Sequence, residues 1–141
     1  MKQILIAVLA VVVGVFVGGL VNMGLVMLGG VLIPPPGGVA ETMESFRQNI
    51  LSYQPIDFLF PFLAHALGTL VGAFVAAKIA GRHTLLLGLI IGAFFLLGGL
   101  MMVFMVGGPA WFIACDLLLA YLPMGYLGAR LAGTRKPSGI S

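Results

Sequence analysis

The chain has 141 residues, of which 61% are hydrophobic and 8% are charged, and its mean hydropathy is +1.19. Soluble domains carry about 25% charged residues, so this composition cannot coat a soluble globule and predicts a membrane protein. The net charge of +3 is spread over short connections, which excludes a nucleic-acid-binding surface, and the lone Cys115 excludes a Cys-x-x-Cys redox pair.

The first predicted element is a transmembrane helix over residues 4–32. It ends before Pro34-Pro35-Pro36, which lack successive backbone donors, and the flexible Gly37-Gly38. No polar sequence follows a small-residue cleavage site, so we expect this helix to be retained rather than removed as a signal peptide.

Residues 33–56 form the largest connection. Glu44 suits the start of a short helix, and Met43, Phe46 and Ile50 follow at spacings of three and four residues. Such an apolar stripe predicts a helix that lies at the membrane surface.

Three further spans are predicted over residues 57–80, 84–106 and 110–132, with a tight turn at 107–109. Because a span needs roughly 20 apolar residues, four of them use most of the chain and leave residues 1–141 as one domain. Basic residues fall mainly at one end of this arrangement: Lys2, Lys78, Arg82, Arg130, Arg135 and Lys136, against Arg47 at the other. The sequence therefore predicts an all-α bundle of four transmembrane helices with both termini cytoplasmic and residues 33–56 as an extracytoplasmic loop.

Aromatic residues are expected near the outer boundary of the bilayer. Tyr53, Phe58 and Trp111 lie where the spans meet the extracytoplasmic connections. Aromatic side chains favour the headgroup region, so we interpret these three as interfacial anchors.

Polar residues within the spans are few, and Asn22, His65 and Asp116 stand out. Each lies on the order of 10 to 15 Å from the outer boundary, because a helix rises about 1.5 Å per residue. The three are therefore expected to share one layer and to meet. They would form either an interhelical clasp, which we favour, or a proton-carrying or substrate-binding site open to the outside.

Small residues recur at intervals of four and allow close approach of helix backbones. The pairs predicted to pack helices are Gly14 with Gly18, Gly68 with Gly72, and Gly125 with Ala129. Close packing within the bundle is the simpler interpretation, and a dedicated dimer face is the alternative.

Neither a cofactor nor a metal site is expected. Methionines near His65 and Cys115 are possible soft ligands for monovalent copper, but methionine is also an adaptable packing residue. His65 and His83 lie at different depths, which argues against a haem held by two histidines.

Several runs resemble one protein family. They are PPP at 34–36, FPFLAHALGTL at 60–70, PAWF at 109–112, Asp116-Leu117 and YLPM at 121–124. On these residues the chain resembles a family of small uncharacterised bacterial four-helix integral membrane proteins over nearly its whole length. The resemblance implies a location in the bacterial inner membrane and supplies no activity.

The sequence thus favours a non-enzymatic membrane protein, either an accessory subunit of a membrane complex or a small homo-oligomer. Its partners would be the lipid bilayer and another membrane protein or a second copy of itself, without nucleic acid. No nucleophile–base pair supports an enzyme. The alternative function is an oligomeric transporter or channel that uses Asp116 and His65.

Overall fold

The computed structural model describes residues 1–38 and 42–133, which are helical apart from short connections. By length and composition, four helical segments can cross a membrane: Lys2–Leu32, Pro55–Ala80, Thr84–Met105 and Ala110–Ala132. These match the predicted spans to within two residues at each end. The all-helical class and the four long apolar helices are therefore confirmed, while the side of the membrane that each end faces stays a prediction.

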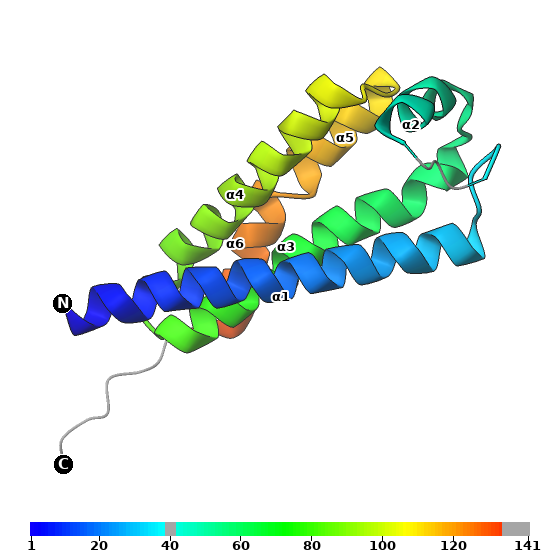
Figure 1. Ribbon diagram of the computed structural model, residues 1–141. Coiled ribbons are helices and arrows are strands. Elements are labelled where there is room, and N and C mark those ends of the chain that lie inside the picture. The colour runs from blue at the N-terminus through cyan, green and yellow to red at the C-terminus, as the bar shows by residue number, and fades with distance from the viewer. Residues whose placement is uncertain (39–41, 134–141) are drawn as a thin grey trace, which may run out of the picture.

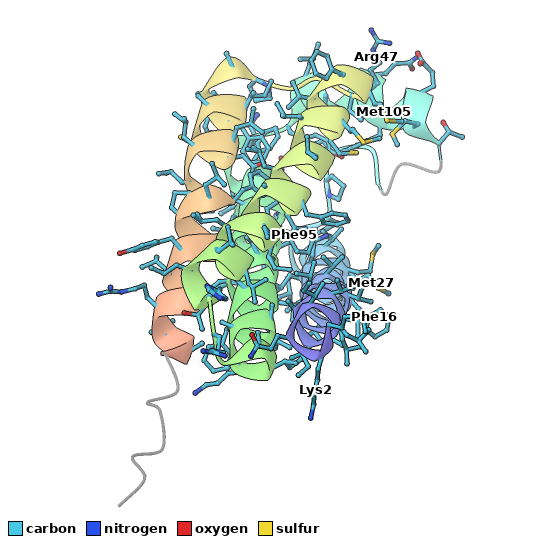
Figure 2. All side chains as sticks on the ribbon, turned by 90° about the vertical axis from the view of Figure 1, so that its left-hand side faces the viewer. Lys2, Phe16, Met27, Arg47, Phe95 and Met105 are labelled. Atoms are coloured by element: carbon cyan, nitrogen blue, oxygen red, sulfur yellow. The ribbon has the colours of Figure 1, made fainter. Side chains whose placement is uncertain are left out.

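Helix α1 (Lys2–Leu32) is apolar on all sides, and its buried residues are all Ala or Gly. Ala10, Gly14 and Gly18 recur every four residues, so they share one face of the helix. Because they carry little or no side chain, α1 approaches its neighbours closely along this stripe. Figure 2 shows Phe16 and Met27 projecting from α1 away from the other helices.

The connection after α1 holds helix α2 (Met43–Asn49) and two 3₁₀ turns, Ile50–Ser52 and Pro55–Phe58. Thr42 caps α2 by accepting a 3.1 Å hydrogen bond from the Ser45 backbone N–H. Ile50 then packs in a buried cluster with Phe58 and Val106. A short helix occurs where the sequence predicts one, and its position at a membrane surface stays a prediction.

Helix α3 (Leu59–Ala80) is central and contacts α1, α4 and α6. Pro61 lies in its first turn, where a missing N–H removes no helical hydrogen bond, so the proline does not kink the helix. Gly81 in the left-handed conformation (φ 65°) ends α3, and α4 (Thr84–Met105) returns antiparallel to it.

The fourth span is interrupted within its length. It consists of α5 (Ala110–Leu119) and α6 (Leu122–Ala132), separated at Ala120–Tyr121. Pro123 lies in the first turn of α6, where its ring would collide with a carbonyl one turn back if the helix continued. Pro123 therefore accounts for a break just before it.

The helices are closely packed at one end of the molecule and diverge toward the other. We call the end with Met1 and Gly81 the terminal end, and the end with α2 the loop end (Figure 1). Toward the terminal end α1 meets α4 where Gly14 faces Ile91 and Gly18 faces Phe95. Toward the loop end α4 and α5 lean away from α1 and α3, as Figure 1 shows.

Candidate ligand cavity and polar site

A cavity of about 710 Å³ lies at the loop end, between the diverging helices. Its volume is in the range of pockets that hold drug-sized molecules, roughly 300 to 1,000 Å³. The walls come from α1, α3, α4, α5 and the connection that carries α2. Most are apolar, and they include Met23, Val26, Ile33, Phe46, Phe58, Phe60, Met102, Val103, Phe112 and Ile113.

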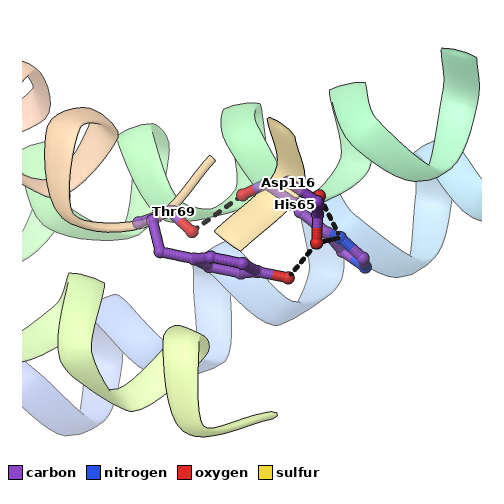
Figure 3. Close-up of polar contacts among 4 residues, drawn as sticks. His65, Thr69 and Asp116 are labelled. Carbon is purple, nitrogen blue, oxygen red and sulfur yellow. Dashed lines mark hydrogen bonds and ion pairs between the residues drawn. The ribbon is translucent and has the colours of Figure 1, made fainter. Parts of the chain in front are cut away.

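The polar groups at the deep end of the cavity are His65 from α3 and Asp116 from α5. His65 Nδ1 lies 2.8 Å from Asp116 Oδ1 and 3.0 Å from Oδ2, as the dashed lines in Figure 3 mark. The Tyr121 hydroxyl donates a 2.8 Å hydrogen bond to Asp116 Oδ2. Asp116 is buried, so these two partners replace the water that its carboxylate has lost.

The helix break explains how Tyr121 reaches Asp116. In a continuous α-helix, side chains five residues apart point about 140° away from each other, because each residue turns by about 100°. Tyr121 has non-helical backbone angles (φ −115°, ψ −81°), and its ring returns toward α5. The ring stacks on the His65 imidazole at 5.6 Å and is fully buried, so the break builds part of the polar site.

Asn22 does not join this pair. Its Cα and Cβ lie against Gly68 of α3, and its amide makes no side-chain hydrogen bond within residues 1–38 and 42–133. Gly68 is three residues beyond His65 toward the terminal end, so Asn22 lies one turn from the site. Of the three residues predicted to meet, the structure joins His65 and Asp116 and adds Tyr121.

His65 presents a second nitrogen. Its side chain is 25% exposed, and only Nδ1 of the ring is hydrogen-bonded among the described residues. While the imidazole is neutral and donates from Nδ1, Nε2 is an acceptor; an imidazolium would donate from both nitrogens. The site can therefore exchange a hydrogen bond or a proton with a molecule in the cavity.

The outer part of the cavity is walled by aromatic rings. Phe58 is at the centre of this cluster, 4.5 Å from Phe112, 5.5 Å from Trp111 and 5.8 Å from Tyr53 between ring centroids. Phe58 is 3% exposed, so its prediction as an interfacial anchor is wrong: it packs against Ile50 of the connection, Val106 at the end of α4 and Phe112 of α5. Trp111 is exposed and Tyr53 half-buried, and their anchoring role stays a prediction.

Asp57 lies near Tyr53 at the rim of the cavity. Its carboxylate accepts a 2.7 Å hydrogen bond from the Gln54 backbone N–H. Burial, and then the charge of Asp57, raise the pKa of the Tyr53 hydroxyl, so that hydroxyl remains protonated. The rim therefore carries one carboxylate and one neutral phenol.

The predicted packing glycines lie at close backbone contacts. A Cβ added to Gly14 would lie 2.6 Å from the Gly72 carbonyl oxygen, and one added to Gly18 would lie 2.6 Å from that of Gly68. Gly125 meets the backbone of Gly88, and Ala129 contacts the same glycine. All six small residues pack helices within this chain. The sequence interpretation did not single out Gly88 or Gly128, and α6 needs both to approach α4 and α3.

Of the possible soft metal ligands, Met23, Met43 and Met102 line the cavity together with His65, whereas Cys115 is exposed and is not part of its wall. Within residues 1–38 and 42–133 there is no group of three His, Cys, Asp or Glu residues placed to hold a metal ion. The mainly apolar walls suit the body of an organic molecule.

The fold and the cavity define an all-helical protein with four helices fit to cross a membrane and an apolar pocket with a His–Asp pair at its deep end. No protein-family model matches the chain, no curated protein is significantly similar to it, and no solved structure matches it. The resemblance to a bacterial membrane-protein family therefore stays a prediction. The function must be argued from the site.

Proposed function

We propose that this chain is a non-enzymatic protein of the bacterial inner membrane that binds an apolar or amphiphilic small molecule. The cavity would be the substrate site of a transporter. Both termini would lie in the cytoplasm, so that the cavity opens in the outer half of the bilayer. The observation that supports this proposal is the 710 Å³ cavity whose deep end holds the His65–Asp116 pair.

The cavity favours this function over a purely structural clasp. A clasp requires the hydrogen bond between His65 and Asp116, which contributes on average about 0.6 kcal/mol between membrane helices. A clasp does not require an adjacent cavity that is lined by the partly exposed imidazole. The clasp and the ligand site are compatible, because the same bond fixes the orientation of the ring toward the cavity.

The distribution of charge supports the proposed orientation. Figure 2 shows Lys2 and Arg47 at opposite ends of the molecule. Lys78 and Arg82 lie with Lys2 at the terminal end, whereas Arg47 is the lone Lys or Arg of the described loop end. Basic residues accumulate on the cytoplasmic side of membrane proteins, so the terminal end would face the cytoplasm.

Occupancy of the cavity can be tested by photolabelling the protein in bilayer nanodiscs with a neutral, lipophilic aryl diazirine. Val103 lines the cavity, whereas its neighbour Phe104 is 86% exposed on the outer face of α4. Val103→Trp should obstruct the part of the cavity beside Met102 and reduce labelling of the peptides around Met102 several-fold, and Phe104→Trp should not. Equal labelling in the two variants, mapped by peptide mass spectrometry, would refute the proposal.

A second candidate function is that of an accessory subunit or homo-oligomer. It is favoured by α1, in which 17% of the residues of an apolar 18-residue window are buried. A Cβ added at Gly19 or Gly24 would meet no atom of the rest of the described chain within 4 Å. A partner helix can occupy that free space. Native mass spectrometry of gently extracted membranes should then show a multimer or a complex, and a monomer without a partner would count against this function.

Both proposed functions require the protein to form an oligomer or a complex. Four helices seldom enclose a complete pathway alone, so transport through this site would also need an oligomer. In vesicles, Asp116→Asn and His65→Ala would be expected to lose substrate flux at unchanged expression.

A further inference from the structure

The charges that line the cavity are of one sign. Among the described residues, the lining includes the carboxylates of Asp57 at the rim and Asp116 at the deep end and no Lys or Arg. His65 is the one residue of this described lining that can become cationic. The ion pair between His65 and Asp116 is the one found within residues 1–38 and 42–133, so Asp57 has no described cationic partner. With both carboxylates ionised, the described lining is negative overall even when His65 carries a proton.

The two carboxylates are separated along the cavity. Asp57 precedes His65 by eight residues, which corresponds to about 12 Å along a helix at 1.5 Å per residue. An anion placed between them would meet two like charges in a medium of low polarity, whereas a cation would meet two opposite ones. Water-poor walls strengthen both effects.

Aromatic rings make up much of the cavity wall. Phe46, Tyr53, Phe60 and Phe112 line the cavity and are partly exposed, whereas Phe58 is buried beside them. The face of an aromatic ring attracts an organic cation by about 0.5 to 2 kcal/mol, depending on how far the cation is desolvated. A small hydrated ion such as sodium gains little here, because apolar walls supply few oxygen ligands to replace its water.

We propose that the molecule bound in the cavity is a lipophilic organic cation, with a quaternary or delocalised positive charge on an apolar body. The inference rests on the proposed function and names the class of its substrate. Apolar walls would take up the body of the molecule, the rings would face the charge, and Asp116 and Asp57 would balance it. The charge complementarity of the lining selects this occupant over a neutral or anionic amphiphile of the same size.

The test uses three tetrahedral molecules of nearly equal size and different charge. Tetraphenylphosphonium, tetraphenylsilane and tetraphenylborate carry positive, zero and negative charge. Each competes with the aryl diazirine for the cavity of the intact protein in nanodiscs, at equal measured concentration in the bilayer. We expect the phosphonium to protect the cavity peptides at a concentration at least tenfold lower than the silane, and the borate to protect least.

Two variants connect the preference to the carboxylates. Asp116→Asn should remove most of the advantage of the phosphonium over the silane, and Asp57→Asn should remove part of it. Should Asp116→Asn fail to fold, the wild-type series and Asp57→Asn still decide the question. Equal protection by the phosphonium and the silane in the wild-type protein would overturn the inference and leave the cavity as a ligand site. Absence of any cavity labelling by the diazirine would instead overturn the proposed function.

Discussion

At the scale of single residues, Asp116 is the group around which the polar site is organised. It is the buried carboxylate of α5, and both of its oxygens are occupied by donors from other parts of the chain. The sequence indicates His65 as a partner because both residues lie at similar depth. Tyr121 is absent from that interpretation, because a continuous helix would direct it away from Asp116.

The contribution of Tyr121 can be measured with a matched pair of variants. Tyr121→Phe removes the hydroxyl that donates to Asp116, and it should lower the free energy of unfolding by about 1 kcal/mol, within the range of interhelical polar contacts in membranes. Tyr126→Phe alters an exposed tyrosine of α6 and should be close to neutral. Reversible unfolding in mixed micelles, followed by circular dichroism, gives both values. Equal effects would show that the hydrogen bond does not stabilise the fold.

At the scale of elements, glycine contacts fix the distances between helices. Gly14 and Gly18 of α1 face Gly72 and Gly68 of α3, so the two backbones touch without intervening side chains. In the absence of a hydrophobic driving force within lipid, this close van der Waals packing is a main source of helix association.

Two glycines of α1 offer a direct comparison. Gly14→Ala would place a Cβ 2.6 Å from the Gly72 carbonyl oxygen and 2.9 Å from Ala76 Cβ, which forces α1 away from α3. We expect a loss of about 1 to 3 kcal/mol, the usual range for overpacking. Gly19→Ala meets no atom within 4 Å and should be neutral, or slightly stabilising through its higher helix propensity. A harmless Gly14→Ala, assayed by the same unfolding titration, would contradict the close approach of α1 and α3.

The break between α5 and α6 has a consequence for the site. It lets α6 pack on α3 and α4 through Gly128 and Gly88, while α5 leans outward with α4. The helices therefore separate on the side of the break that faces the loop end. The cavity occupies the space that this separation creates.

At the scale of the whole molecule, the terminal end is closely packed and the loop end holds the cavity. Close packing of small residues holds the helices together at the terminal end, so the helices can lie apart at the loop end within one bundle. Whether the open end faces outward determines which side of the membrane supplies the ligand.

The orientation can be tested with single cysteines in a Cys115→Ser background. Gln48 on α2 and Arg82 in the turn between α3 and α4 are both exposed and lie at opposite ends. A thiol reagent that cannot cross membranes should label Gln48→Cys in intact cells or spheroplasts and Arg82→Cys only after lysis. The reverse pattern would place the cavity on the cytoplasmic side and contradict the proposed topology.

Hydropathy along the chain is enough to locate the four apolar helices, because the thickness of a bilayer requires a continuous apolar run of about 20 residues. The sequence also indicated that Gly14, Gly18, Gly68 and Gly72 pack helices, because an interval of four residues places them on one face. The depth of His65 and Asp116 along their helices was sufficient to predict that they could meet.

Features that depend on the rotation and tilt of the helices are visible in the folded structure and not in the sequence. The burial of Phe58, the separation of Asn22 from the polar pair and the contact of Tyr121 with Asp116 all follow from how the helices are turned about their axes. The cavity arises from the angle at which α4 and α5 diverge from α1 and α3. Hydropathy records how deep a residue lies and carries no information on these angles, which are set by contacts between residues far apart in the chain.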